Sequence, residues 1–522
     1  MKKRLSVLLA LALSVSMLTA CGGSGTTSGG SNNSGAQSGT EQAKGGNVIK
    51  LAVSTDLTSL DPHNHNDSPS GYATRHIYST LIRLNENNEF VGDLVEKWDY
   101  KDDKTVEFTL KDGVKFHNGE TLKADDVKFS LERQKESPKV GHLITMIDSI
   151  EVVDDLHFVL HLNTPSNALI SSLAHMGSAI LCKSYVEGLE AEGKKIDDYP
   201  MGTGPYSFVN WTPGSSWELK KFDDYFDESR KAQNDGLLAK IIPEESSRTI
   251  ALENGEVDIL INVPATDAQK IRDNDKLVLD EYIQTVIEYF CMNVEKAPFD
   301  NVKVRQAMNY AINKDDVSIA AINGEGTTTN SYIGEAAIGW YDTCVKYDYN
   351  PEKAKELLAE AGYGDGFTFT CFVSSDKRAR AATVVQANLQ ELGITMEIEQ
   401  MEASTFYDRT GKGEHAACMS GWVANAEPDN TYRPLFTSEK AGPGGNRSFY
   451  KNPEVDALVD DAAVNLDKDK VAEDYKTVLK TISEDAIWAP LYSETGLIAR
   501  NKDLQGLGIS PIGMHDFSGL HY

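Results

Sequence analysis

The chain has 522 residues, of which 40% are hydrophobic and 25% are charged, and this is ordinary globular composition. Its 79 acidic residues outnumber its 51 lysines and arginines, which gives a formal net charge of −28. Such acidity argues against nucleic-acid binding and against broad electrostatic docking on an anionic membrane. The only long apolar run lies at the N-terminus, so the sequence excludes a polytopic membrane protein.

The first 46 residues are predicted to be a targeting signal followed by a tether. A basic start precedes an apolar stretch at 5–18, which is too short to span a bilayer and is typical of a secretory signal. The next residues, Leu-Thr-Ala-Cys21, resemble the lipobox of bacterial lipoproteins, whose cysteine carries the lipid; an ordinary signal peptide with a chance cysteine is the alternative. We therefore expect a signal peptide at 1–20, a lipid on Cys21, and a flexible Gly/Ser-rich tether within 21–46.

The first part of the folded chain is predicted to be rich in β-strands. Residues 48–54 alternate between polar and apolar, residues 105–110 are β-prone, and 150–162 contain two strands joined by a turn. A Pro-Gly pair within 206–220 indicates a hairpin. A helix is expected at 125–134.

The later part of the chain alternates between helices and strands. Asn350 is predicted to cap a helix that begins at Pro351 and ends at Gly362. Further elements are expected as helices at 304–312, 379–392 and 404–410 and as strands at 367–373, 394–400 and 416–422. This order predicts a mainly parallel sheet in an α/β domain. Since ligands of open α/β sheets bind beyond the carboxyl ends of strands, 422–436 is the first candidate binding segment.

Catalytic and metal-binding motifs are missing from the sequence. There is no nucleophile elbow, no HExxH pair, no P-loop and no GxGxxG after the first strand. His63 and His65 alone are weak evidence for a metal, and His157 and His161 are interpreted as structural. No CxxC is present among the cysteines after Cys21, which we interpret as small buried hydrophobes, although one pair could bridge: Cys182, Cys291, Cys344, Cys371 and Cys418. We expect no metal, no cofactor and no enzymatic activity.

Several segments form a recognisable pattern in chain order. The longest runs from Val91 to Arg133 and includes GVKFHNGETLKADDVKFSLER. The others are SLDP at 59–62, MGTGPY at 201–206, ALENGEVDI at 251–259, PFDNVKVRQAMNYAINKDDV at 298–317, NPEKAKELLAEAGY at 350–363, and GW at 421–422 followed by YKNPEVDALVDDA at 450–462. In this order they resemble the substrate-binding proteins of bacterial ABC importers, in the oligopeptide and dipeptide family (solute-binding protein family 5, cluster C).

The resemblance implies an α/β fold of the type II periplasmic-binding-protein kind, with two lobes, a hinge and an extra subdomain. Lobe I would consist of residues 47–82, 199–285 and 490–522, with the extra subdomain at 83–198. Lobe II would consist of residues 286–489. The ligand would lie between the lobes, which close on it about the hinge.

The resemblance also implies a function. The chain would be an extracytoplasmic receptor that binds short peptides and delivers them to ABC permease and ATPase subunits. It would act as a monomer without nucleic acid, held by its lipid on the outer face of the cell membrane, and the long tether favours a Gram-positive surface over a periplasm. A secreted hydrolase is the alternative of a different class, but no nucleophile supports it.

One position departs from the peptide-binding pattern. Those relatives clamp the ligand's amino group with an Asp after the Gly-Trp pair, and the aligned residue here is Asn425, which lacks a charge. Glu427 or Asp429 could replace it if the loop is shifted. Residues 427–436 resemble the glutathione-binding branch, so glutathione, a nickel chelate, heme or a sugar remain alternative ligands.

Four further residues are candidates for ligand contact. Arg433 could pair with a ligand carboxylate, or it could form an ion pair within the protein. Trp422 could stack on the ligand, or it could belong to the core at its strand end. Ser68 and Tyr72 follow the first strand in a loop that relatives direct toward the cleft.

Overall fold

The computed structural model describes residues 47–85, 89–424 and 426–522. The predicted signal peptide, the tether, Cys21 and Asn425 therefore lie outside the described residues. No helix among those that are described has both the length and the apolar composition needed to cross a membrane.

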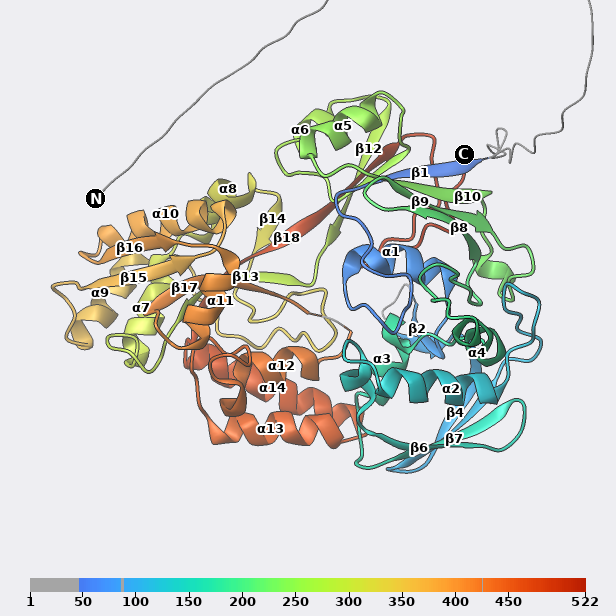
Figure 1. Cartoon of the computed structure of the whole chain (residues 1–522). Coiled ribbons are helices and arrows are strands. Elements are labelled where there is room, and N and C mark those ends of the chain that lie inside the picture. Colours follow the sequence, from blue (N-terminus) through green and yellow to red (C-terminus); the bar gives the residue numbers. More distant parts are fainter. Residues whose placement is uncertain (1–46, 86–88, 425) are drawn as a thin grey trace, which may run out of the picture. The chain divides into compact units, whose positions relative to one another are not determined.

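Twelve strands of the described chain join into one large sheet (Figure 1). The main path runs β16-β15-β17-β13-β18-β11-β1-β10-β9-β8, and β12 and β14 also pair with β18. The first strand set is β1 (Val48–Val53), β8 (Tyr206–Thr212), β9 (Ser216–Lys221), β10 (Gly236–Ile241), β11 (Ile259–Ile261) and β12 (Leu277–Ile283). The second strand set is β13 (Val286–Met292), β14 (Gly326–Thr328), β15 (Thr368–Val373), β16 (Thr395–Gln400) and β17 (Ala417–Val423).

One long strand, β18 (Trp488–Asn501), belongs to both sets. Its first part pairs with β13 and β14, and its second part pairs with β11 and β12. The change of partner from β14 to β12 falls between Glu494 and Thr495, a little after the boundary at 490 that the sequence predicts. The chain also passes from the first set to the second in the short step between Ile283 and Val286.

The strand directions differ from the mainly parallel sheet that the sequence predicts. β15 is parallel to both β16 and β17, as the β-α-β-α-β order predicts. However, β17 is antiparallel to β13, and β13 is antiparallel to β18. The sheet is therefore mixed rather than mainly parallel, because β13 lies between β17 and β18 and runs in the direction opposite to both.

Helices cover the second strand set, and local sequence signals explain their ends. They are α7 (Val302–Ala311), α8 (Lys314–Ile322), α9 (Pro351–Glu360), α10 (Asp376–Gln390), α11 (Ala403–Gly411), α12 (Asp429–Phe436), α13 (Pro453–Val464) and α14 (Lys468–Glu484). At α9, the Asn350 side chain accepts a hydrogen bond from Lys353 N, and Gly362 has a φ of 83° just beyond the helix. The predicted cap, start and stop of this helix are confirmed.

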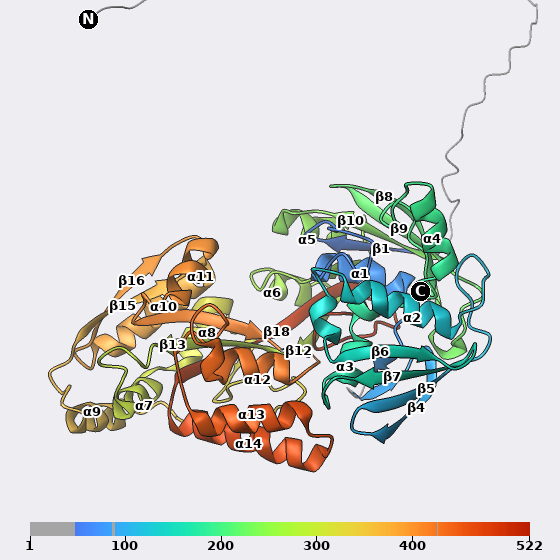
Figure 2. The same cartoon turned by 60° about the horizontal axis from the view of Figure 1, so that its bottom comes forward.

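A separate four-stranded sheet lies within residues 95–162. Its order is β4 (Val95–Asp102), β5 (Thr105–Leu110), β7 (His157–Leu162) and β6 (Ile147–Val152). A small hairpin, β2 (Ile82–Leu84) and β3 (Phe90–Gly92), precedes it, and α2 (Ala124–Lys135), α3 (Leu169–Ala174) and α4 (Lys183–Ala191) accompany it. Figures 1 and 2 both show α2 beside this sheet. Phe108, Leu131 and Phe158 belong to its own buried core, which is distinct from that of the large sheet.

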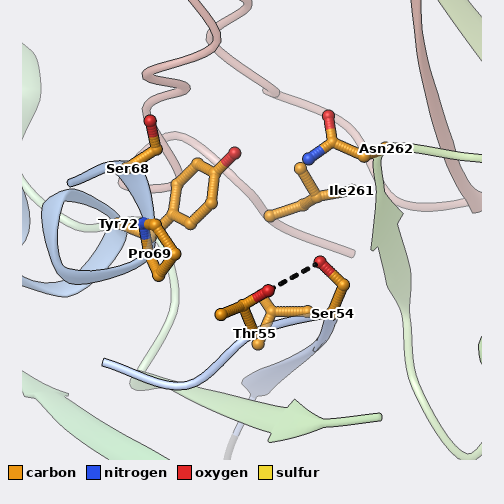
Figure 3. A pocket seen from close by; sticks show the side chains of 8 residues that line it. Ser54, Thr55, Ser68, Pro69, Tyr72, Ile261 and Asn262 are labelled. Carbon is orange, nitrogen blue, oxygen red and sulfur yellow. Dashed lines mark hydrogen bonds between the residues drawn. The ribbon is translucent and has the colours of Figure 1, made fainter. Parts of the chain in front are cut away.

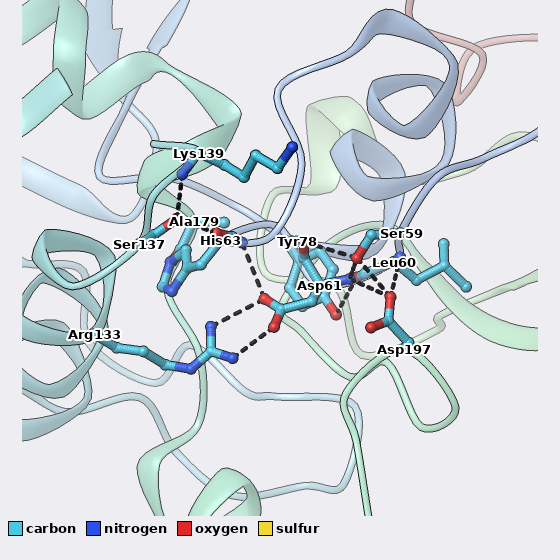
Figure 4. A network of polar contacts seen from close by, with 10 residues as sticks. All are labelled: Ser59, Leu60, Asp61, His63, Tyr78, Arg133, Ser137, Lys139, Ala179 and Asp197. Carbon is cyan, nitrogen blue, oxygen red and sulfur yellow. Dashed lines mark hydrogen bonds and ion pairs between the residues drawn. The ribbon is translucent and has the colours of Figure 1, made fainter. Parts of the chain in front are cut away.

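The remaining helices are α1 (Ser68–Ile77), α5 (Glu245–Glu253) and α6 (Ala268–Arg272). The loop between β1 and α1 is anchored by polar contacts (Figure 4). Ser59 Oγ donates to Asp197 at 2.5 Å, and His63 Nε2 lies 3.1 Å from the Ala179 carbonyl oxygen. These contacts fix the loop that leads into the N-terminus of α1.

Candidate functional site

A pocket of about 80 Å³ lies where β1 and β11 end and α1 begins (Figure 3). β1 and β11 are parallel neighbours, so their carboxyl ends meet at the same edge of the sheet. This is the edge at which open α/β sheets bind ligands. The lining residues are Val53, Ser54, Thr55, Ser68, Pro69, Tyr72, Ile261 and Asn262.

Both residues predicted in this region, Ser68 and Tyr72, line the pocket. Asp67 caps α1 by accepting a hydrogen bond from Ser70 N, which fixes the start of the helix at Ser68. Tyr72 lies four residues later and therefore on the same helix face. Burial raises the pKa of Tyr72, so its hydroxyl remains neutral and can both donate and accept hydrogen bonds.

Asn262 is a pocket residue that sequence reasoning missed. It lies directly after β11, with a φ of 59°, in the left-handed region that Asn tolerates better than most residues. Its side chain lines the pocket together with Tyr72 and acts to lower the pKa of the Tyr72 hydroxyl, against the effect of burial. Strained backbone of this kind often marks a ligand site. The only signal in the sequence is a polar residue that follows the apolar run of β11.

Trp422 lies near the carboxyl end of β17, at the end of the second strand set. It is half-buried and packs against the cluster that contains Tyr289 and Trp488, while the next residue, Val423, is 62% exposed. Trp422 therefore has one part in the core and lies beside an exposed strand end. Its indole Nε1 is buried without a hydrogen-bond partner among the described residues.

Ala424, the residue after β17, forms hydrogen bonds with Thr285, which lies in the short segment between the two strand sets. Thr285 Oγ1 donates to the Ala424 carbonyl oxygen at 2.7 Å, and Ala424 N donates to the Thr285 carbonyl oxygen at 3.2 Å. This pair of hydrogen bonds links the step at 283–286 to the residue that follows β17.

Three predicted site residues lie together in one polar cluster at the start of α12. Arg433 Nε donates to Asp429 at 2.9 Å and Nη1 donates to Asp460 at 2.7 Å. Ser171 Oγ donates to the buried Glu427 carboxylate, whose pKa burial raises. Of the two roles considered for Arg433, the structure contains the ion pair within the protein. A ligand carboxylate would have to compete with the two aspartates.

A second charged cluster was not predicted from the sequence. Arg378, near the start of α10, donates to both carboxylate oxygens of Glu288 at 3.0 and 3.1 Å. Lys377 Nζ lies 3.3 Å from Glu288 and also pairs with Glu494. A Cβ on Gly421 would lie 2.7 Å from the Glu288 carboxylate, so any larger residue would require the Glu288 side chain to shift. The one sequence signal is an acidic residue within the apolar strand β13.

These groups are suited to reversible binding, since they offer hydroxyls, fixed charges and an aromatic surface. In the described part of the chain, the His, Cys, Asp and Glu side chains placed to hold a metal ion are Cys291, His415 and Cys418, away from the pocket residues. His63 and His65 do not belong to that group.

Known proteins resemble the chain over nearly its whole length. The model of the bacterial extracellular solute-binding proteins, family 5 Middle, matches residues 89–443. A glutathione-binding protein of Pectobacterium atrosepticum is 33% identical over 484 residues, which cover 90% of this chain and 92% of that protein. The dipeptide-binding protein of Escherichia coli is 30% identical over 475 residues, which cover 85% and 88%.

Two solved structures share the fold. The periplasmic binding protein DppA of Helicobacter pylori, in complex with the peptide STSA, has a TM-score of 0.73 and 30% identity, and the alignment covers 91% of this chain and 98% of that one. HbpA2 of Haemophilus parasuis has a TM-score of 0.83 and 29% identity, with 91% and 99% covered.

Proposed function

The chain belongs to the bacterial extracellular solute-binding proteins of family 5, and we propose that it captures short peptides and delivers them to an ABC importer. One observation carries the proposal. Relatives that match most of the chain are named for glutathione and for dipeptides, and both ligands have a peptide backbone with charged ends. We propose that the protein binds peptides and does not catalyse their hydrolysis, so incubation with the protein should leave peptides intact.

We propose that the ligand lies between the two strand sets, which act as lobes. Ser68, Tyr72 and Asn262 would contact it from the first set, and the exposed part of Trp422 from the second. An extended peptide gains strand-like hydrogen bonds from such a site, and its side chains occupy roomy pockets. The hinge would consist of the 283–286 step and the partner change in β18.

The ligand's amino group needs an acceptor in this site. Asp429 already has Arg433 as its counter-charge, and Glu427 is buried and accepts a hydrogen bond from Ser171. We therefore propose that Asn425 accepts a hydrogen bond from the ligand ammonium. The Thr285–Ala424 hydrogen bonds join the residue that precedes Asn425 in the sequence to the proposed hinge.

Native mass spectrometry of the mature protein, purified without added ligand, tests the ligand class. A spread of extra masses that match di- to hexapeptides is expected. A single added mass equal to glutathione would support the second candidate, which the glutathione-binding relatives favour. Added masses of a sugar or a metal chelate would contradict both.

Calorimetric titration of the same peptide into variants tests the site. Trp422→Ala and Tyr72→Phe should each weaken binding about tenfold, or about 1.4 kcal/mol. Tyr349→Phe is the matched control, because this tyrosine is exposed and lies outside the pocket lining. The peptide affinity of this variant should equal that of the wild type. Unchanged affinity in both site variants would overturn the assignment.

We further propose that Cys21 carries a lipid and that the monomeric receptor is tethered to the outer face of a Gram-positive membrane, beside its permease and ATPase partners. The Leu-Thr-Ala-Cys motif and the Gly/Ser-rich segment after it support this proposal. Cys21→Ala should release the protein from cell membranes into the medium. Retention of this variant on the membrane would contradict the lipid anchor.

A further inference from the structure

Three chemically reactive side chains meet inside the second strand set, away from the pocket residues. Cys291 on β13 lies directly opposite Cys418 on β17, and His415 precedes β17 by two residues. One possible ligand atom from each residue lies within 4.8 Å of the other two. All three residues are fully buried.

The histidine is oriented as a metal ligand would be. Its Nε2 donates to the Arg447 carbonyl oxygen at 2.9 Å, because a carbonyl can only accept. In the neutral ring, Nδ1 therefore keeps its lone pair. Nδ1 is buried and has no hydrogen-bond partner among the described residues. Histidines that bind metals commonly donate their second ring nitrogen to a backbone carbonyl in this way.

We propose that Cys291, His415 and Cys418 bind one Cu(I) ion. Thiolate and imidazole ligands suit soft cations such as Cu(I) and Zn(II). Structural Zn(II) almost always takes four ligands, whereas the described residues supply three here.

Charge also favours the monovalent ion. The surroundings are apolar, with the rings of Phe372 and Phe449 near His415. Arg447 lies close enough to act electrostatically on both thiols. When both cysteines bind as thiolates, Cu(I) neutralises one negative charge and Arg447 the other. Zn(II) would leave a net positive charge in an apolar core, which is costly.

The proposed ion is structural rather than transported. Since the three ligands have no exposed surface, the site would be filled while the chain folds. Binding displaces the thiol protons to solvent and transfers no electron. The ion would join β13 to β17 four residues before Trp422, so it would stiffen the strand that carries the proposed ligand contact.

The test uses the full chain, purified under nitrogen from cells grown with added copper, and also chain refolded with Cu(I). Native mass spectrometry should find one copper per chain, and X-ray absorption should show two sulfur ligands and one nitrogen ligand. Because the ion binds only the folded state, it should also raise the thermal midpoint. Copper-free protein in both preparations, or one zinc in place of copper, would overturn the proposal.

Variants distinguish copper binding at this site from unspecific binding of copper to other cysteines. Cys418→Ser and Cys291→Ser should lose the copper, with folding checked by circular dichroism. Cys371→Ser is the matched control, because Cys371 is equally buried but belongs to a different core cluster, and it should keep the copper. Copper retained by Cys418→Ser would contradict the assignment. A protein two mass units lighter, with linked Cys291 and Cys418 peptides, would identify a disulfide instead.

Discussion

Arg133 donates two hydrogen bonds to the carboxylate of Asp61, Nη1 to Oδ1 at 3.0 Å and Nη2 to Oδ2 at 2.5 Å (Figure 4). Asp61 lies in the loop after β1, and Arg133 lies on α2. The pair therefore ties the helix beside the four-stranded sheet to the loop that leads into the proposed ligand pocket. Such a two-bond fork fixes orientation as well as distance.

Asp61→Asn should destabilise the protein by about 3 kcal/mol, because it leaves the Arg133 charge without its partner in a mostly buried place. Urea unfolding measures the change. Asp99→Asn, which breaks the exposed pair with Lys101, is the control and should cost less than about 1 kcal/mol. Equal losses in the two variants would show that the Asp61 pair is no stronger than a surface pair.

The Asp61 pair should also depend on pH. Burial alone would raise the pKa of Asp61, but the hydrogen bonds and charge of Arg133 outweigh it and hold the pKa below its ordinary value of 3.8. The stability from this pair is therefore complete above the ordinary pKa and is lost as the pH falls through the lowered one. Asp61→Asn should lack this acid-dependent part, which unfolding at a series of acidic pH values would detect.

His63 should make the protein lose stability at a higher pH than its carboxylates do. Burial and the nearby Arg133 charge lower the pKa of His63 from 6.5 to about 4. Between these values the unfolded chain binds a proton that the folded chain does not, so stability falls by about 1.4 kcal/mol per pH unit as the pH decreases. His63→Gln should remove this part of the slope and leave the part that comes from other buried histidines, such as His117 and His175. His161→Gln changes an exposed histidine and should leave the pH dependence of stability unchanged. An equal change in the two variants would contradict the role of burial.

Glu427 should make the stability of the protein depend on pH. Burial raises the pKa of Glu427, although the hydrogen bond from Ser171 Oγ favours the ionised carboxylate and acts in the opposite direction. The contribution of Glu427 to stability is therefore complete below the ordinary pKa of 4.5 and is lost as the pH rises through the raised value. This loss should be absent in Glu427→Gln, whereas the exposed Glu454→Gln should behave as the wild type does, and urea unfolding across pH compares the three proteins.

Gly421→Ala should disturb the Glu288 cluster. Its new Cβ would lie 2.7 Å from the Glu288 carboxylate and 2.9 Å from Arg378 Nη2, which forces a shift that costs about 1 to 3 kcal/mol. Gly188→Ala is the matched control, because that Cβ meets nothing within 4 Å in the middle of α4. It should stabilise the protein by up to about 1 kcal/mol, since alanine favours a helix. Thermal unfolding of the two variants should shift in opposite directions.

The sequence alone determined the elements whose causes lie within a few residues. The cap of α9 at Asn350, its stop at Gly362 and the hairpin of β8 and β9 follow from side-chain and backbone interactions between near neighbours. Ser68 and Tyr72 were predicted from the resemblance, as part of a loop that relatives direct toward the cleft, whereas the structure places both in helix α1. The family pattern could be recognised because its segments keep their order along the chain.

Tertiary structure decided what depends on strand pairing. It placed β13 and β18 antiparallel within the large sheet, brought Asn262 to Tyr72, and set Cys418 opposite Cys291. The partners in each case are far apart in the chain, and no local pattern specifies which strands become neighbours. Register is instead fixed by burying the apolar residues of all strands at once, so these sites are properties of the packed sheet and not of any one segment.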